Sequence, residues 1–148
     1  MGLAGTVTHI GVCVSEMARS RRFYEEGLGF RFVRELRVAG EPSDTLLELS
    51  GVDLHAVYVE RDGFCLELLH YASPRSAAVA PPHAMNDLGF THLSIQVPSI
   101  ATAVAALRAA GAVILEATRI EIGGREVAIF ARDPDGLLIE LVAAPPGA

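Results

Sequence analysis

Two histidines and two glutamates stand at matching places in the two halves of this 148-residue chain. His9 lies in the segment Thr-His-Ile-Gly-Val-Cys-Val, and His92 lies in Thr-His-Leu-Ser-Ile-Gln-Val. Glu67 follows Asp-Gly-Phe-Cys-Leu, and Glu140 follows Asp-Gly-Leu-Leu-Ile. Such groups on otherwise apolar segments are costly to bury without a partner, and a shared divalent cation would satisfy all four. The pattern therefore predicts a metal site built from His9, Glu67, His92 and Glu140.

The predicted ligand set narrows the choice of metal. Two neutral imidazoles and two carboxylates suit Zn²⁺, Ni²⁺, Co²⁺, Fe²⁺ or Mn²⁺ by ligand type. Four protein ligands on an octahedral ion leave two positions for water or for substrate oxygens. We therefore expect one divalent ion per site, with the open positions that catalysis needs.

The elements that must position these side chains repeat in the same order in each half. Apolar periodicity and turn residues predict a strand, a helix and three further strands, twice. In the first half the strands are expected at 7–14, 30–38, 55–60 and 64–71, with the helix at 17–26. In the second half they are expected at 90–97, 113–120, 126–131 and 137–142, with the helix at 100–110.

This order predicts an α+β fold of two βαβββ modules, at 6–71 and 90–143, joined by an Ala/Pro-rich linker at 72–89. We expect residues 1–148 to form a single domain in which the modules make a curved, cup-like mixed β-sheet. Side chains alternate across a strand, so residues two positions away share a face with each glutamate. Those residues are apolar, and Glu67 and Glu140 should therefore face a dry interior or a cleft. Tyr58, Ser94 and Gln96 are expected to line the substrate pocket.

Composition excludes several classes of function. The net charge of −6 and the absence of a Lys/Arg-rich run argue against nucleic acid as a partner. No stretch approaches the roughly 20 apolar residues that span a bilayer, and no signal peptide is evident, so we expect a cytoplasmic protein without a membrane partner. The hydrophobic fraction of 51% exceeds what a small monomer needs, which favours a homodimer that acts on a small molecule.

Several motifs together resemble one known family, the vicinal oxygen chelate superfamily, also called the glyoxalase/bleomycin-resistance/dioxygenase superfamily. The resemblance covers nearly the whole chain and implies a paired βαβββ fold with a divalent metal that chelates neighbouring substrate oxygens. In this resemblance His9, Glu67, His92 and Glu140 fall on the four metal positions. The motifs that carry it are the segment at 8–14, Arg-Phe-Tyr-Glu-Glu-Gly-Leu-Gly-Phe at 22–30, Leu-Glu-Leu-Leu at 66–69, Phe-Thr-His-Leu at 90–93 and Asp-Pro-Asp-Gly-Leu-Leu-Ile-Glu-Leu at 133–141.

Because all four positions are filled, the resemblance favours a lyase or isomerase that transfers a proton next to a metal-chelated carbonyl of a small oxygenated substrate. Glu140 is the expected base, since its counterpart has that role in glyoxalase I, and Glu67 can deliver or accept a second proton. The turn at 133–136 resembles glyoxalase I. The segment at 66–70 resembles methylmalonyl-CoA epimerase, although Arg132-Asp133-Pro134-Asp135 replaces the His-Pro-Lys element of those epimerases.

Two other activities and two assemblies stay open at the level of sequence. Extradiol-type dioxygenases of this superfamily use two His and one Glu, and they typically lack an acid at the position of Glu67. Bleomycin-binding members usually lack the ligands, so a metal-free small-molecule-binding or resistance protein is the remaining alternative. The four ligands can meet within one chain or across a dimer, and the sequence is compatible with both arrangements.

Overall fold

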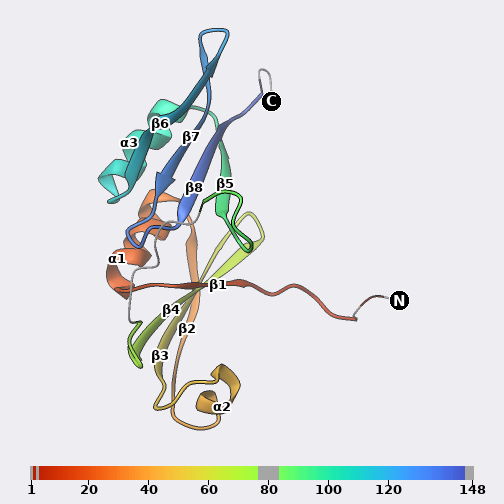
Figure 1. The fold of residues 1–148 in the computed structure, drawn as a ribbon, viewed down its shortest axis with the longest axis vertical. Coiled ribbons are helices and arrows are strands. Elements are labelled where there is room, and N and C mark those ends of the chain that lie inside the picture. The colour runs from red at the N-terminus through yellow and green to blue at the C-terminus, as the bar shows by residue number, and fades with distance from the viewer. Residues whose placement is uncertain (1, 3, 77–83, 146–148) are drawn as a thin grey trace. The chain divides into compact units, whose positions relative to one another are not determined.

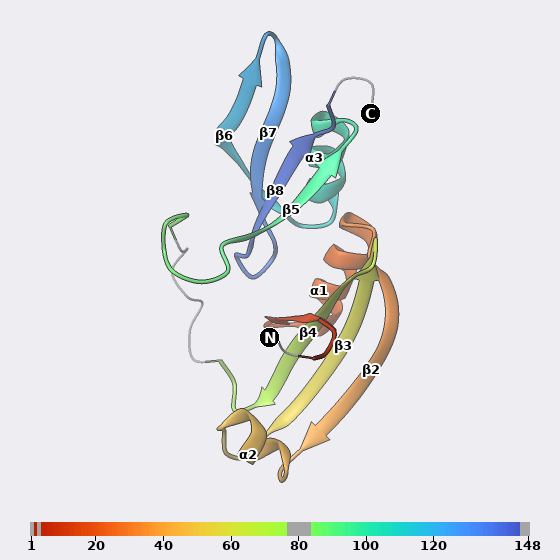
Figure 2. The same cartoon turned by 90° about the vertical axis from the view of Figure 1, so that its right-hand side faces the viewer.

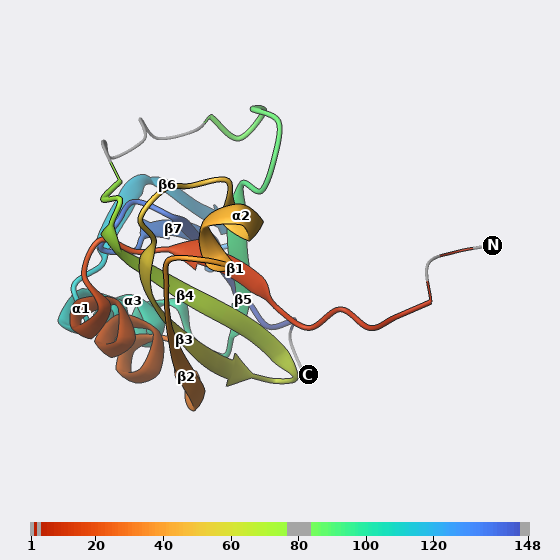
Figure 3. The same ribbon diagram turned by 90° about the horizontal axis from the view of Figure 1, so that it is seen from below.

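The first half of the chain forms a four-stranded mixed sheet (Figure 1). The computed structural model describes residues 2, 4–76 and 84–145. Strand β1 runs parallel to β4, whereas β2 and β3, and β3 and β4, pair antiparallel, in the order β1-β4-β3-β2. Figure 3 shows β4, β3 and β2 side by side. The strands are β1 (Ile10–Cys13), β2 (Arg31–Ala39), β3 (Asp53–Arg61) and β4 (Phe64–Ser73).

The second half repeats this topology in a second four-stranded sheet (Figure 2). The order is β5-β8-β7-β6, again with a parallel first pair and antiparallel pairs after it. The strands are β5 (His92–Val97), β6 (Val113–Ile122), β7 (Arg125–Arg132) and β8 (Leu138–Ala143). The predicted α+β class with a duplicated strand pattern is therefore confirmed.

Three α-helices accompany the sheets in the described residues. Helix α1 (Met17–Arg22) continues as a π-helical turn, η1 (Phe23–Gly27), and α2 (Ser43–Leu47) is short. Helix α3 (Ile100–Ala109) begins after Ser99, whose hydroxyl accepts a hydrogen bond from the Thr102 backbone N–H at 3.2 Å. None of the described helices is long and apolar enough to cross a membrane.

The predicted element boundaries differ from the structure where cross-strand pairing decides them. Strand β1 was expected from Val7 but begins at Ile10, because its pairing with β4 starts at Ile10 opposite Leu66 and Val7 is almost fully exposed. Strand β3 begins at Asp53, two residues earlier than expected, because Asp53 pairs with β2 and β4. Part of the expected linker, residues 77–83, lies outside the described residues.

The chain divides into two compact units, and their composition does not follow chain order. The first unit contains β1, β2, α2, β3 and β4, whereas the second contains β5, α3, β6, β7 and β8 together with the helical segment Arg19–Leu28. Gly27 explains how this segment approaches α3 so closely. A Cβ at Gly27 would lie 2.7 Å from the Cβ of Ala110, so only glycine fits there. The module bounds 6–71 and 90–143 remain predictions.

A buried carboxyl group joins the segment Arg19–Leu28 to the turn before β8. The phenol of Tyr24 donates a hydrogen bond to Asp133 Oδ2 at 3.0 Å, and both side chains are buried. Asp133 Oδ1 accepts from the backbone N–H groups of Asp135 at 2.9 Å and Leu137 at 2.8 Å. Arg19 adds an ion pair to Asp135 at 2.7 Å. Burial raises the pKa of Asp133 above its ordinary value, and it also raises the pKa of Tyr24.

This raised pKa predicts a pH dependence of stability that Asp133→Asn should remove. The folded protein holds a proton on Asp133 more tightly than the unfolded chain does, so the contribution of this group to stability falls as pH rises from about 4 through its raised native pKa. Asparagine keeps an acceptor for the two backbone N–H groups but does not titrate there. The unfolding free energy of the wild type minus that of the variant should therefore decrease as pH rises. Urea unfolding between about pH 4 and 7.5 measures this difference.

Asp62→Asn is the matched control, because Asp62 lies in the exposed turn between β3 and β4. A difference between wild type and Asp133→Asn that stays constant over the whole pH range would contradict the assignment.

Candidate metal centre

His9 and Glu67 form a pair within the first unit. In the parallel ladder Gly11 lies opposite Glu67, and His9 precedes Gly11 by two residues, so alternation puts His9 on the face of Glu67. His9 Nε2 lies 3.0 Å from Glu67 Oε2. The pair is partly shielded, because the Glu67 side chain is only 15% exposed. Strand pairing thus joins two residues that are far apart in sequence.

A threonine hydroxyl contacts the other ring nitrogen of His9. Thr8 Oγ1 lies 3.0 Å from His9 Nδ1. A neutral imidazole that donates its Nε2 proton to the carboxylate accepts at Nδ1, and a hydroxyl can donate there. The same hydroxyl can accept if the proton moves to Nδ1. Thr8 therefore suits either tautomer of His9 and leaves Nε2 directed at Glu67.

Tyr58 on β3 engages the second oxygen of Glu67. It lies directly opposite Glu67 in the antiparallel ladder, and its phenol donates a hydrogen bond to Glu67 Oε1. Its ring also meets the His9 ring edge to face, with centroids 5.3 Å apart. Burial and the neighbouring Glu67 carboxylate raise the pKa of Tyr58, which keeps the phenol protonated as a donor. Both oxygens of Glu67 are therefore held.

The second unit repeats the pair with His92 and Glu140. His92 Nε2 lies 3.6 Å from Glu140 Oε2, and Thr91 Oγ1 lies 2.8 Å from His92 Nδ1. Ser94 on β5 lies opposite Glu140 and donates a hydrogen bond to the same Oε2 at 2.7 Å. Glu140 Oε1 accepts no hydrogen bond from any residue that the structure describes. Glu140 therefore has partners at only one of its oxygens, whereas Glu67 has a partner at each oxygen.

Phe130 takes the place of Tyr58 in the second unit. It lies opposite Glu140 on β7, and its ring meets the His92 ring edge to face at 5.6 Å. Phenylalanine has no hydroxyl to offer the carboxylate, and the donor comes instead from Ser94, which occupies the position that Gly11 has in the first unit. Each glutamate therefore receives one hydroxyl donor, but from a different neighbouring strand.

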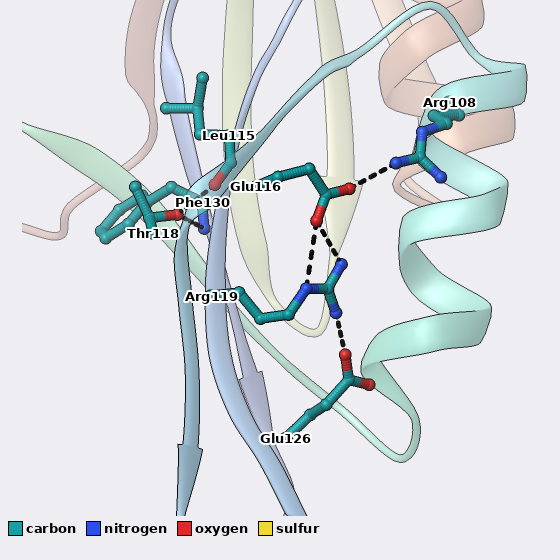
Figure 4. A network of polar contacts seen from close by, with 7 residues as sticks. All are labelled: Arg108, Leu115, Glu116, Thr118, Arg119, Glu126 and Phe130. Carbon is teal, nitrogen blue, oxygen red and sulfur yellow. Dashed lines mark hydrogen bonds and ion pairs between the residues drawn. The ribbon is translucent and has the colours of Figure 1, made fainter.

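A bulge in β6 holds the backbone of Phe130 (Figure 4). The register shifts between Leu115 and Ile120, and Thr118 fills the interruption. The Phe130 backbone N–H donates to Thr118 Oγ1 at 2.9 Å, and the Thr118 hydroxyl donates to the Leu115 carbonyl at 2.7 Å. These two bonds replace ladder bonds that the bulge removes and keep Phe130 beside His92.

Charged side chains beside this bulge connect β6 to α3 and β7 (Figure 4). Glu116 accepts hydrogen bonds from Arg108 on α3 and from Arg119, the latter at 2.7 Å. Arg119 also pairs with Glu126 on β7. The guanidinium of Arg119 lowers the pKa of Glu116. This exposed network orients the bulged strand, and screening by solvent limits its contribution to stability.

The structure thus places the four predicted metal ligands as two pairs, one in each unit. Among the residues that the structure describes, no three His, Cys, Asp or Glu side chains gather closely enough to hold a metal ion. Tyr58 and Ser94, predicted for the pocket, contact the two glutamates. Gln96 is exposed opposite Val142, two residues beyond Ser94. The assignment of all these residues to one metal site stays a prediction.

Sequence reasoning missed the threonines and Phe130, although signals for them were present. The dipeptide Thr-His occurs at the start of both halves. The segments Ala-Val-Tyr-Val at 56–59 and Ala-Ile-Phe-Ala at 128–131 also correspond, which aligns Phe130 with Tyr58. Comparing the two halves position by position would have found both.

Comparison with known families decides the membership of the chain. A sequence model of the Glyoxalase/Bleomycin resistance protein/Dioxygenase superfamily matches residues 6–141. The chain belongs to this superfamily. No curated protein sequence matched the chain. The match of a superfamily model over most of the chain confirms the resemblance that the repeated motifs indicated.

Solved structures of superfamily members share the fold. A glyoxalase family protein from Bacillus cereus is 18% identical, with a TM-score of 0.78 over 96% of this chain and 98% of that one. The trypanothione-dependent glyoxalase I of Leishmania major is 25% identical, with a TM-score of 0.63 over 91% of this chain and 84% of that one. A variant of the fosfomycin resistance protein FosX from Listeria monocytogenes, complexed with Mn(II) and 1S,2S-dihydroxypropylphosphonic acid, is 14% identical, with a TM-score of 0.61 over 98% and 94% of the two chains.

Removing the phenol that holds Glu67 should cost measurable stability. Tyr58→Phe keeps the ring against His9 but deletes the hydrogen bond to Glu67 Oε1, and one bond to a partly exposed carboxylate is worth about 1 kcal/mol. We expect the free energy of unfolding to fall by that amount in urea titrations. The control is Tyr71→Phe, which removes a phenol on the same face of β4 as Glu67 and should leave stability nearly unchanged. Equal losses in the two variants would contradict the role of the phenol.

Proposed function

We propose that the protein is a divalent-metal-dependent lyase or isomerase that transfers a proton next to a chelated carbonyl of a small oxygenated substrate. The observation that carries this proposal is the repeated pair: in each unit an imidazole Nε2 lies 3.0 or 3.6 Å from a glutamate Oε2. Membership of the superfamily supports it, and so do glyoxalase I and the Mn(II) complex of FosX among the similar structures.

The chemistry of the donors fits a divalent ion. His9, Glu67, His92 and Glu140 would supply two imidazole nitrogens and two carboxylates, a set suited to Zn²⁺, Ni²⁺, Co²⁺, Fe²⁺ or Mn²⁺. An ion held there would polarise a carbonyl oxygen of the substrate and acidify the neighbouring C–H bond. A histidine that gives its Nε2 to a metal must carry its proton on Nδ1. The threonine hydroxyls at 3.0 and 2.8 Å from Nδ1 can accept a hydrogen bond from this N–H group, so they suit the metal-bound tautomer as well.

The unequal environments of the two glutamates favour different roles. Tyr58 and His9 engage both oxygens of Glu67, which suits a carboxylate that stays in place as a ligand. Glu140 has only Oε2 engaged, by Ser94 and His92, so Oε1 can approach a substrate proton. We therefore assign the role of general base to Glu140. Glu67 is the second candidate for proton transfer.

We also propose that the active form of this lyase or isomerase is a homodimer. Each unit supplies only two of the four ligands, so the set requires both units, from one chain or from two. Strands β1 and β5, which carry or adjoin the histidines, lie at the ends of their sheets. End strands offer unpaired backbone groups to another chain.

Metal content tests the ligand assignment without knowledge of the substrate. His9→Ala and His92→Ala each remove one imidazole ligand, and removing even an outer-shell partner costs 10- to 100-fold in affinity, so we expect at least about a 100-fold loss. The wild type should retain one ion per site after loading and desalting, as measured by elemental analysis. The control His70→Ala lies three residues from Glu67 on β4, hence on its opposite face, and should keep the ion.

Two results would overturn this function. Wild-type metal content in both histidine variants would show that the pairs do not bind the ion. Oxygen uptake by the metal-loaded protein with a catechol would assign the chain to the extradiol-type dioxygenases, because a lyase or isomerase consumes no oxygen. A loaded wild-type protein that is active under anaerobic conditions supports the proposal.

Mixing two variants that each bind metal weakly shows whether the four ligands come from one chain or from two. If a site joins His9 and Glu67 of one chain with His92 and Glu140 of the other, a mixed dimer of His9→Ala and Glu140→Ala chains holds one intact and one doubly altered site. High-affinity metal binding then partly returns on mixing. If each site forms within one chain, every site keeps a defect and binding stays low. Light scattering at micromolar concentration checks the dimer, and a mass of one chain would contradict it.

A further inference from the structure

A bulge in β2 brings an arginine onto the face that carries the first pair. Phe32 pairs with Val59 on β3, but the next pair joins Arg34 to Tyr58, so Val33 is the extra residue. In a regular ladder Val33 would lie opposite Tyr58, and Arg34 would lie opposite Val57. Neighbouring residues of a strand point to opposite faces, so the bulge transfers Arg34 to the face of Tyr58.

The guanidinium of Arg34 lies over the aromatic ring of Tyr58, whose phenol holds Glu67. The guanidinium carbon lies 3.6 Å from the centroid of the Tyr58 ring. A guanidinium carries five N–H donors, so one that contacts Tyr58 keeps donors for a further hydrogen-bonding partner. Arg31 on the same strand pairs with Glu60 at 3.2 Å, but Arg34 forms no ion pair with a carboxylate in the part of the chain that the structure describes.

The resulting row runs across the sheet from β2 to the start of β1, in the order Arg34, Tyr58, Glu67 and His9. Neighbouring strands lie roughly 4.8 Å apart, so β2 is about 10 Å from β4, a distance that a small molecule and an arginine side chain can bridge. The second unit has Leu115 opposite Phe130, where the first unit has Arg34 opposite Tyr58. The arginine is therefore present beside the His9–Glu67 pair, and the corresponding position beside the His92–Glu140 pair is a leucine.

We propose that Arg34 determines substrate specificity by binding an oxyanion group, a carboxylate or a phosphate-type group, of the molecule whose other oxygens meet the metal centre. This inference rests on the proposed function. The planar fork of a guanidinium matches the two oxygens of such a group, and the contact of Arg34 with the Tyr58 ring limits the side-chain motion that binding must arrest. The substrate is thus a small anion of a few carbons that carries its charge away from the chelating oxygens.

Two metal chelators that differ by one charge test the inference. Butanohydroxamic acid and succinic acid monohydroxamate carry the same chelating group on a chain of similar length, and only the second ends in a carboxylate. In calorimetric titrations of the metal-loaded wild type, the carboxylated chelator should bind about tenfold more tightly, the value of one charge-assisted hydrogen bond. Arg34→Gln should abolish this preference, whereas Arg34→Lys should keep part of it. A phosphonate of the same length shows which oxyanion Arg34 prefers.

Arg37→Gln is the matched control, because Arg37 lies on the same strand three residues away, on the opposite face. It should keep the tenfold preference. Equal binding of the two chelators to the wild type, or an equal loss of preference in the Arg34 and Arg37 variants, would overturn the inference while leaving the metal centre intact. Failure of the wild type to retain metal would instead overturn the proposed function, and the inference with it.

Discussion

A carboxylate that sits on a largely apolar sheet must find hydrogen-bond partners, and this requirement organises both halves of the molecule. The immediate chain neighbours of Glu67 and Glu140 are buried leucine and isoleucine side chains on the opposite face of each sheet, and the two glutamates are themselves only partly exposed. Each accepts a hydrogen bond from one hydroxyl on a neighbouring strand and has one imidazole Nε2 at 3.0 or 3.6 Å. Losing such a hydroxyl partner of a partly exposed carboxylate costs about 1 kcal/mol. The register of the strands is therefore tied to the chemistry of these pairs.

The two pairs are equivalent in position but not in environment. The first has a phenol from Tyr58 and the cation of Arg34 over its ring, whereas the second has a hydroxyl from Ser94 beside the apolar ring of Phe130. One glutamate is consequently held through both oxygens and the other through one. A duplicated scaffold thus provides a restrained carboxylate and a freer one, and this difference suits a reaction in which one group binds and the other moves a proton.

The two compact units also do not coincide with the two halves of the repeated sequence. The helical segment Arg19–Leu28 belongs by chain order to the first half, yet it packs in the second unit. Gly27 permits the close approach to Ala110, and the buried bond from Tyr24 to Asp133 satisfies polar groups on both sides of the contact. Because the chain passes from the first unit to the second and back, the second unit contains segments from both halves of the sequence, whereas the first unit contains residues of the first half alone.

Local pattern was enough to predict much of this protein. Apolar periodicity and turn residues identified the eight strands, most boundaries within about two residues, because both signals are local to each segment. The duplicated motifs identified the superfamily and paired each histidine with a glutamate. Only the tertiary structure decided that Arg34 shares the face of Tyr58, that Thr118 repairs the β6 bulge beside Phe130, and that Arg19–Leu28 packs in the second unit. A bulge shifts register by one residue and reverses every face after it, and close packing depends on residues far away in the chain, so neither can be deduced from local periodicity.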